Sequence, residues 1–264
     1  MKEIQYDKEN VNLLWTGGWD STFQLLQLLI IQRCQVTPFY LLDEQRMSTG
    51  VEILTIKRIK NRLLKDYPHT RELLQPTKFF SVADISPDSE ITEAYQSILK
   101  EKFIGCQYDW IPRFCKESGV TDMQLCIHRD DKAHFVLDKF VRKNPSDCQE
   151  VFQVDQKFEE TNEYAVFRYF SFPIFQLSKI QMSAIAKKQG WENIMGLTWF
   201  CHAPRINMKP CGVCNPCLYT LQEGLGWRIP RSRRMALFYH KQFIRPAKSL
   251  VKIVLGQLGL LSRS

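Results

Sequence analysis

Apolar residues in the first part of the chain form short runs separated by stretches with helical spacing. An apolar run at 11–15 ends at two adjacent glycines, and apolar side chains then recur at helical spacing over 23–30. A second run, rich in β-branched and aromatic residues, follows at 36–42, and an amphipathic, basic stretch follows at 51–65. The order strand, helix, strand, helix predicts an α/β fold with a parallel sheet and right-handed crossovers.

The same kind of pattern continues along the chain. Three further strands are predicted, at 78–82, 122–128 and 165–170. A mostly helical insertion is predicted near 88–120, between the third and fourth strands, and a further helix is predicted at 179–189. Residues 142–163 are polar and charged, so we expect an exposed excursion there.

Charge is distributed unevenly along the 264 residues. The formal net charge is +8, and nine Lys and Arg residues follow Glu223, after which there is no acidic residue. Residues 1–223 therefore sum to −1, so a nucleic acid is not the expected partner of the body of the protein. The basic tail at 231–264 also carries apolar side chains. It could lie on an anionic membrane surface, dock on an acidic partner or subunit, or pack on its own domain.

The nine cysteines bear on the compartment and on metal binding. Five are scattered, and an odd total with one tight cluster predicts reduced thiols and a metal site rather than disulfide staples. The scattered residues are Cys34, Cys106, Cys115, Cys126 and Cys148. The N-terminal sequence lacks the basic start and apolar run of a secretory signal, and no run of eighteen apolar residues occurs. We therefore expect a cytoplasmic protein.

The tight cluster is Cys201, Cys211, Cys214 and Cys217, with the spacing Cys-x9-Cys-x2-Cys-x2-Cys. Four thiolates at this spacing can close a tetrahedral shell around Zn²⁺. They leave no ligand position for a catalytic water, so the predicted zinc is structural. Four buried free cysteines are the alternative interpretation.

The two adjacent glycines lie in the segment Thr16-Gly17-Gly18-Trp19-Asp20-Ser21, between the first predicted strand and helix. Adjacent glycines let the backbone fold tightly, so that several N–H groups and the helix N-terminus can converge on an anion such as phosphate. Ser21 and Thr22 can donate hydroxyl groups to phosphate oxygens, and Asp20 can hold Mg²⁺. An ordinary turn followed by a helix N-cap is the alternative interpretation.

This segment resembles the Ser-Gly-Gly-x-Asp-Ser loop of the PP-loop ATP pyrophosphatases, with Thr16 in place of the usual serine. Together with the cysteine spacing it is similar to one branch, the 7-cyano-7-deazaguanine synthases of queuosine biosynthesis. Weaker similarities occur at Phe172-Pro173-Ile174, Leu177-Ser178-Lys179 and Leu197-Thr198-Trp199-Phe200-Cys201-His202, and the resemblance spans residues 11–226. It implies a Rossmann-like fold of the adenine nucleotide alpha hydrolase type. Three segments are then expected: a PP-loop domain at 1–197, a zinc-binding segment at 198–230 and the basic tail at 231–264.

The resemblance also implies which residues form the site. ATP-binding residues are expected at Leu14, Trp15, Thr16, Gly17, Gly18, Trp19, Asp20, Ser21 and Thr22. The implied catalytic residues are Asp20, Ser21, Lys179 and Arg113, and the implied substrate contacts are Gln45, Arg46 and Arg113. The stretch after the fourth strand departs from the family, and His128 and Asp130 are interpreted there as part of a solvated loop. Trp19 and Trp199 fit either purine stacking or core packing.

The implied activity is an ATP-dependent carbon–nitrogen ligation that uses Mg²⁺ with ATP. A small carboxylic acid, 7-carboxy-7-deazaguanine, attacks the α-phosphorus, pyrophosphate leaves, and ammonia converts the acyl-adenylate into an amide. A second ATP then gives the nitrile, and a homodimeric assembly is compatible with this activity. Three alternatives stay open: conjugation of an activated acid to a different amine or macromolecule, tRNA thiolation using Cys106, Cys115 or Cys126, and a non-catalytic nucleotide-binding scaffold.

Overall fold

Five strands form a parallel sheet in the order β3-β2-β1-β4-β7 in the computed structural model, which describes residues 10–145 and 149–239. The strands are β1 (Val11–Leu14), β2 (Val36–Leu42), β3 (Lys78–Ser81), β4 (Met123–Gln124) and β7 (Phe170–Ser171). The chain runs outward from β1 to β3 and then returns to the other side of β1 for β4 and β7. The strand order therefore reverses between β1 and β4, as in doubly wound Rossmann-like folds. The predicted α/β fold class is confirmed.

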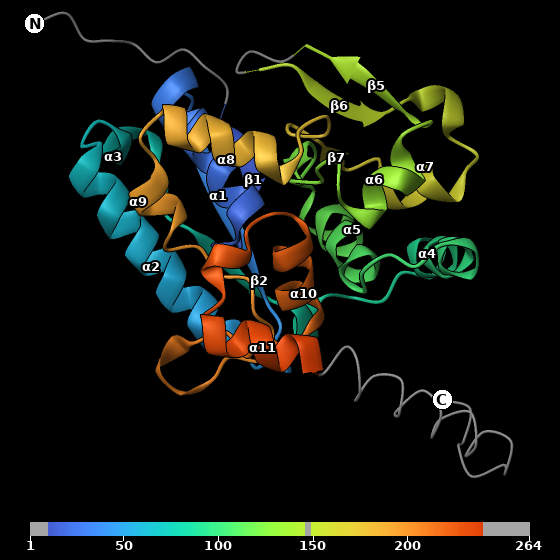
Figure 1. Ribbon diagram of the computed structural model, residues 1–264. Helices are drawn as coiled ribbons and strands as arrows, with labels where there is room; N and C mark the ends of the chain where they lie inside the picture. The colour runs from blue at the N-terminus through green and yellow to red at the C-terminus, as the bar shows by residue number, and fades with distance from the viewer. Residues whose placement is uncertain (1–9, 146–148, 240–264) are drawn as a thin grey trace, which may run out of the picture. The chain divides into compact units, whose positions relative to one another are not determined.

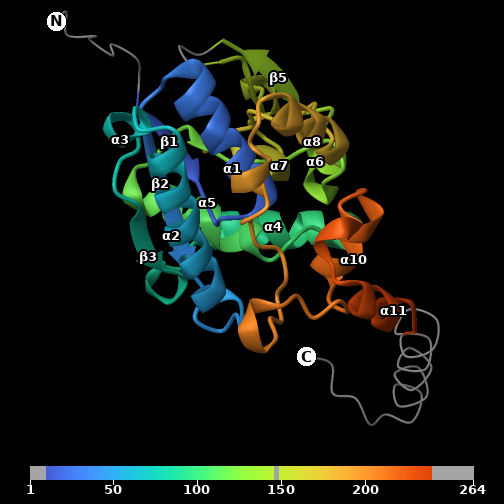
Figure 2. The ribbon, with the colours of Figure 1, turned by 60° about the vertical axis from the view of Figure 1, so that its left-hand side comes forward.

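Helices cover both faces of this sheet (Figure 1), and the rotated view separates the two layers (Figure 2). One layer holds α1 (Trp19–Leu26), its continuation as the π-helix η1 (Gln27–Gln32), α2 (Thr49–Asp66), α8 (Lys179–Lys188) and α9 (Glu192–Met195). The other layer holds α4 (Ser89–Glu101), α5 (Gln107–Ser118) and α7 (Asn162–Phe167). Shorter helices are α3 (Thr70–Leu73), η2 (Val82–Asp84), α6 (Lys132–Leu137) and η3 (Gln156–Phe158).

Burial along each strand follows from its place in the sheet. The inner strands β1 and β2 are covered on both faces, and Leu13 and Val36 are fully buried. The edge strand β3 has one open side, and Phe79 on it is 46% exposed. An apolar cluster lies between the sheet and the layer of α4, α5 and α7, and it includes Phe39, Tyr108, Phe114, Met123 and Phe167. This core fixes the strands whose ends carry the candidate site.

The predicted strand at 165–170 is wrong over most of its length. Residues 162–167 form helix α7, and only Phe170 belongs to β7. Thr161 caps the helix, because its hydroxyl accepts a hydrogen bond from the backbone N–H of Tyr164 at 3.2 Å. The capping threonine, and not the apolar run after it, decides the local structure. The predicted strand at 122–128 is likewise reduced to the two residues of β4.

The predicted exposed excursion at 142–163 contains an ordered hairpin. Strands β5 (Val141–Asn144) and β6 (Val151–Val154) pair antiparallel, and Phe152 bridges to Phe172 next to the main sheet. Val151 and Val154 are buried, so the expectation of a solvated segment is wrong for β6. Glu150 before it and Lys157 after it are exposed, and such polar neighbours conceal the two buried valines in the sequence.

The scattered cysteines are not all reduced. Cys106, Cys115 and Cys126 are free thiols, whereas Cys34 is disulfide-bonded, so the expectation of reduced scattered thiols is wrong for Cys34. Burial raises the pKa of the Cys115 thiol to about 12. Cys148 lies outside the described residues.

Two compact units divide the chain after Trp199. The first contains the sheets and helices described above. The second contains η4 (Ile206–Met208), α10 (Asn215–Gln222), η5 (Gly226–Arg228) and α11 (Arg231–Tyr239). Helix α11 is the start of the predicted tail, and its remainder, 240–264, lies outside the described residues. Within the described ranges, no helix combines the length and apolar character needed to cross a membrane.

Candidate nucleotide and metal sites

The glycine turn joins the carboxyl end of β1 to the N-terminus of α1. Gly17 has a φ of +71°, and a Cβ atom there would lie 3.1 Å from the side chain of Thr55 and 3.3 Å from that of Ile56. Its carbonyl accepts a hydrogen bond from the backbone N–H of Trp199 at 2.9 Å. Gly18 is extended, with φ −73° and ψ 170°, and caps α1 without a side chain. The left-handed conformation and the close approach of α2 both require glycine at position 17.

Asp20 lies on the first turn of α1 and is the centre of a charged cluster. Its Oδ2 atom lies 3.6 Å from the Nζ atom of Lys179 and 3.9 Å from the Nε2 atom of His128. Asp20 follows β1, His128 follows β4 and Lys179 follows β7. The three side chains therefore converge at the carboxyl ends of neighbouring strands, at the switch point where ligands bind in open α/β sheets.

Asp130 forms hydrogen bonds with both His128 and Lys179 of this cluster. Its Oδ2 atom accepts a hydrogen bond from the backbone N–H of Lys179 at 3.1 Å, and its own N–H donates to Nδ1 of His128 at 3.1 Å. Ser178 and Gln181 form a capping box at the start of α8, which fixes the helix turn that carries Lys179. The lysine side chain is thus positioned by its helix start and by the loop after β4.

Two polar atoms of the turn are buried without a hydrogen-bond partner among the described residues. They are Oδ1 of Asp20 and the hydroxyl oxygen of Ser21. Leaving a buried polar atom unpaired costs about 1–3 kcal/mol, so such atoms point to a ligand. A carboxylate oxygen suits Mg²⁺ and a serine hydroxyl can donate to a phosphate oxygen. The residues present therefore fit a bound magnesium–phosphate group.

Other residues of the expected ATP-binding segment belong to the core. Leu14, Trp15 and Trp19 are buried, and the indole N–H of Trp15 donates to the Thr22 hydroxyl at 3.0 Å. Thr22 is fully buried. Its oxygen accepts a bond from the core, so it supports α1 from within, whereas Thr16 is only partly buried. The buried residues of this segment therefore support the turn from the core, whereas Thr16 lies nearer its surface.

The segment after β2 places Gln45 and Arg46 in different surroundings. The Nη2 atom of Arg46 lies 3.5 Å from Oε1 of Glu52, a buried carboxylate. Glu52 also accepts hydrogen bonds from Tyr40 at 2.8 Å and from Ser48 at 2.7 Å. Burial, together with this carboxylate, raises the pKa of Tyr40. Arg46 therefore balances a buried acid at the start of α2, whereas the backbone N–H of Gln45 bonds to Asp43 nearby.

Arg113 lies on α5 and pairs within its own helix. Its Nη2 atom lies 3.0 Å from Oδ2 of Asp109, and its Nε atom donates to the Asp109 carbonyl at 3.2 Å. Asp109 also accepts a hydrogen bond from Thr92 of α4 at 2.8 Å. These contacts link α4 to α5. The described contacts of Arg113 do not bring it to Asp20 or Ser21, with which the family resemblance groups it.

His128 belongs to the charged cluster around Asp20, although its sequence context predicts a solvated loop. It is 3% exposed, so its interpretation as part of a solvated loop is wrong, although Asp130 is exposed. The signal available in the sequence was its place at the carboxyl end of a predicted strand, at the edge of the sheet where ligands bind. Cys126 precedes it by two residues, and burial, reinforced by the negative charge of Asp20, raises the pKa of that thiol.

Cys201, Cys211, Cys214 and Cys217 come together in the second unit. Their sulfur atoms all lie within 4.8 Å of one another, with Sγ–Sγ distances of 3.5 Å for the last pair and 3.8 Å between Cys201 and Cys214. Backbone N–H groups bond to two of the sulfurs: that of Cys211 donates to Cys201, and those of Val213 and Cys214 donate to Cys211. Such donors stabilise thiolates. The cluster can therefore bind a metal, as zinc or as an iron–sulfur centre.

Hydrogen bonding among the close sulfurs sets their proton affinities. A bond with Cys214 is the main reason that the pKa of Cys201 is raised to about 12, and the pKa of Cys217 is raised too. Bonds from the same two thiols lower the pKa of Cys214. Four thiolates this close repel one another, so full deprotonation requires a cation among them.

Comparisons with known proteins leave the family of the chain open. No protein-family model matches the sequence, and it has no significant similarity to a curated protein. A solved structure that aligns with it is the U34-tRNA thiolase NcsA from Methanococcus maripaludis with its [4Fe-4S] cluster. The identity is 11% and the TM-score 0.42, over 93% of this chain and 75% of the thiolase. A match at this level supports no conclusion about function.

Proposed function

We propose that this protein cleaves ATP at the glycine turn and uses it to activate a carboxylic acid by adenylation. One observation carries the proposal: Oδ1 of Asp20 and the hydroxyl oxygen of Ser21 are buried at the sheet's switch point without a hydrogen-bond partner in the described part of the chain, and Lys179 lies beside Asp20. Strand ends, a helix N-terminus and a cation meet there. This combination suits a polyphosphate better than an uncharged ligand.

The charged and polar groups around the turn have separate roles in this proposal. Backbone N–H groups at the start of α1 and the Ser21 hydroxyl bind phosphate oxygens, and Lys179 neutralises the charge that develops on the departing pyrophosphate. Asp20 would hold Mg²⁺ with its carboxylate, and the ion would supply further charge neutralisation. Asp20 Oδ2 and Asp130 orient Lys179. Catalysis here rests on positioning and on electrostatics.

The chemistry proposed is carbon–nitrogen ligation. An oxygen of the substrate carboxylate attacks the α-phosphorus of ATP, the bond to the β-phosphate oxygen breaks, and pyrophosphate leaves. Ammonia then attacks the acyl carbon, AMP leaves and an amide forms after loss of a proton. The resemblance to 7-cyano-7-deazaguanine synthases makes 7-carboxy-7-deazaguanine the first acid to test. Gln45 and Arg113 remain proposed substrate contacts, whereas Arg46 is paired with Glu52 and has a structural role.

We propose that the four-cysteine cluster holds one structural Zn²⁺. Four sulfurs at about 2.3 Å from one zinc ion are roughly 3.8 Å apart in a tetrahedron. The observed Sγ–Sγ distances of 3.5, 3.8 and 3.9 Å agree with that spacing. A [4Fe–4S] cluster binds each cysteine to a different iron and therefore spreads the sulfurs farther apart. The ion ties the loop after Cys201 to the start of α10.

A sulfur-transfer reaction finds less support in the structure. A thiol-dependent transfer uses a thiolate near the nucleotide, and Cys126 is the thiol on which the charge of Asp20 acts. Its pKa is raised by burial and by Asp20, which disfavours the thiolate. Conjugation of the activated acid to another amine uses the same first step, so it is the main alternative for the acceptor.

Pyrophosphate release tests the nucleotide site. Wild-type protein, Asp20→Ala and Ser21→Ala are incubated with ATP, Mg²⁺, ammonium and 7-carboxy-7-deazaguanine, and pyrophosphate is measured by a coupled assay. Asp84→Ala is the matched control, because Asp84 is an exposed carboxylate in η2. We expect loss of release in both turn variants and full activity in the control. Equal rates in all four proteins would show that the glycine turn is not the site of cleavage.

Mass spectrometry of the products then identifies which acid is activated and which acceptor receives it. An amide or nitrile of the deazaguanine supports the full proposal. If pyrophosphate is released without these products and a different added amine is modified, adenylation is supported and that amine, instead of ammonia, is the acceptor. Incorporation of sulfur into tRNA would instead establish thiolation.

A further inference from the structure

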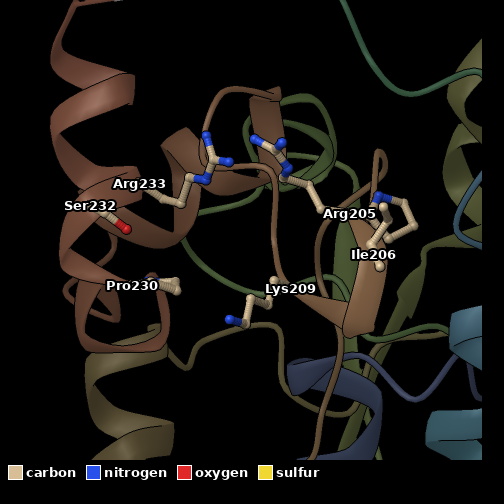
Figure 3. Close-up of a pocket in the computed structure, with 7 residues that line it drawn as sticks. Arg205, Ile206, Lys209, Pro230, Ser232 and Arg233 are labelled. Carbon is tan, nitrogen blue, oxygen red and sulfur yellow. The ribbon is translucent and has the colours of Figure 1, made fainter.

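A second candidate ligand site lies in the unit that begins at Phe200. A hollow of about 480 Å³ is lined by side chains from the loop at 204–209 and from the start of α11 (Figure 3). This volume falls within the range of small-molecule sites. None of the lining residues is one of the four cysteines, and none belongs to the glycine turn.

The loop that forms one wall is closed by its own backbone. The N–H of Arg205 donates to the carbonyl of Lys209 at 2.9 Å, and the two residues form an antiparallel bridge. Between them Asn207 and Met208 have φ values of +65° and +54°. The tight loop brings the side chains of Arg205 and Lys209 to the same hollow.

Close packing against the cysteine loop fixes the opposite wall. Gly212 has a φ of +77°, and a Cβ atom there would lie 2.7 Å from Cβ of Arg233. The start of α11 therefore packs directly on the backbone between Cys211 and Cys214. Figure 3 shows the guanidinium groups of Arg205 and Arg233 facing each other across the hollow, with the Lys209 ammonium group below them.

The charge of the lining is entirely positive. Arg205, Lys209 and Arg233 line the hollow without any acidic side chain, and none of them forms an ion pair within the described residues. Over 200–239 the sequence has six Lys and Arg residues and one acid, Glu223. Three like charges around one hollow repel one another, so an anion placed among them stabilises the arrangement.

Other groups in the hollow favour phosphate as that anion. Ser232 lies in the first turn of α11 and supplies a hydroxyl. The N–H groups of Arg233 and Arg234 bond to the Pro230 carbonyl, which leaves those of Arg231 and Ser232 at the helix N-terminus, where anions bind favourably. Guanidinium groups bind phosphate oxygens in a bidentate manner. Pro204, Ile206 and Pro230 supply apolar walls for an uncharged part of the ligand.

We propose that this hollow binds a ligand carrying two or more phosphate groups. Such groups occur in a free nucleotide or polyphosphate and in the backbone of a polynucleotide. The proposal is independent of the nucleotide site at the glycine turn, because it uses different residues in the other unit. It assigns a role to three basic residues of the second unit, Arg205, Lys209 and Arg233.

Isothermal titration calorimetry of the full chain tests it with two probes, inorganic tripolyphosphate and a short oligouridylate. The test variant combines Arg205→Gln, Lys209→Gln and Arg233→Gln. The control combines Lys65→Gln, Lys187→Gln and Lys188→Gln, which removes the same charge from exposed helix positions of the first unit. Ser21→Ala is titrated as well, so that binding at the glycine turn is recognised separately.

We expect the test variant to bind at least one probe about tenfold more weakly or worse, in line with the loss of charge-assisted hydrogen bonds. The control variant and Ser21→Ala should bind the same probe with the affinity of the wild type. Pocket-dependent binding of tripolyphosphate alone identifies a free polyphosphate ligand, and tighter, strongly salt-dependent binding of the oligouridylate identifies a polynucleotide.

Unchanged binding in the test variant, or an equal loss in the control, overturns the proposal. Arg205→Gln alone guards against misfolding of the triple variant, because Arg205 is exposed and its backbone makes the loop contact. Thermal unfolding and metal content of each variant are measured alongside. If Arg205→Gln folds like the wild type and still binds both probes with full affinity, the proposal is also overturned.

Discussion

At the scale of single residues, local contacts decide what a side chain of given chemistry does. Lys179 and Arg46 are both cations that follow strands of the same sheet, yet Lys179 faces Asp20 and Arg46 faces the buried Glu52. The backbone of Gly17 also depends on its surroundings. Its positive φ strains any larger residue, and the Thr55 side chain would have to shift to make room for one. The surroundings of a residue, and not its type alone, set its role.

Replacing Gly17 with alanine should destabilise the fold. The left-handed conformation costs a side chain roughly 1–2 kcal/mol, and the contact with Thr55 and Ile56 adds to this. Urea unfolding measures the difference. Gly50→Ala is the matched control, because Gly50 lies in the first turn of α2 with nothing within 4 Å of the added methyl group. It should be neutral or stabilising by up to about 1 kcal/mol. Equal stability of the two variants would contradict the conformation assigned to the turn.

Replacing Lys179 with methionine should reduce pyrophosphate release by about 10²-fold or more, the typical cost of removing one group that stabilises developing charge. Methionine is an unbranched helix former of similar bulk, so α8 should form normally. Lys188→Met, at the exposed end of the same helix, is the control and should be fully active. Steady-state rates at saturating ATP provide the comparison. Similar rates for both variants would remove Lys179 from the catalytic group.

At the scale of elements, side-chain caps decide where several helices begin. Thr161 starts α7, Ser178 and Gln181 start α8, and Asp88 starts α4. The Asp88 carboxylate accepts a hydrogen bond from the N–H of Ile91 at 3.0 Å and one from Lys116 of α5 at 2.5 Å. The same side chain thus ends the loop before α4 and links two neighbouring helices of one layer.

The cap at Asp88 should give a pH-dependent contribution to stability. Its hydrogen bond from Lys116, followed by the bond from Ile91, lowers the pKa of Asp88 below its ordinary value of 3.8. The contribution is therefore complete above pH 3.8 and is lost as the pH falls through the lower value in the folded state. Asp88→Ala should cost about 1 kcal/mol at about pH 7 and less at about pH 3. Urea unfolding at both pH values checks this, with the exposed Glu93→Ala as control. A difference that is the same at both pH values would contradict it.

At the scale of the whole molecule, the two units differ in the groups available to stabilise them. The first has a continuous apolar core between its sheet and its helices. The described part of the second, 200–239, is short and carries the four-cysteine cluster. Segments of this size usually need a metal or disulfides to fold stably. Metal binding should therefore matter to the second unit much more than to the first.

Metal removal should unfold the second unit selectively. Mass spectrometry of the native protein should give one zinc ion per chain, and Cys214→Ala or a strong chelator should abolish it. Limited proteolysis should then cut within 200–239, while the fragment that contains the sheet stays resistant. Cys106→Ala is the control, because that thiol is exposed and lies outside the cluster. Retention of zinc in Cys214→Ala, or more than one metal ion per chain, would argue against a single zinc site formed by the four cysteines.

The sequence by itself determined the order of β1, α1, β2, α2 and β3, because apolar periodicity there is uninterrupted and glycine marks the turn. It also determined the four-cysteine cluster, since ligand spacing along the chain limits how far the sulfurs can separate. It missed helix α7 and the hairpin of β5 and β6, whose local signals are short. The fold class was predictable because it depends on the order of elements more than on their exact ends.

Only the tertiary structure decided which side chains meet. Asp20, His128 and Lys179 are far apart in the sequence and converge because parallel strands present their carboxyl ends at one edge of the sheet. The burial of His128 and the pairing of Arg46 with Glu52 depend on how helices and loops pack around the sheet. So does the cationic hollow, whose walls lie on either side of the cysteine loop in the sequence. Periodicity records which face of an element is buried, whereas packing determines what that face contacts.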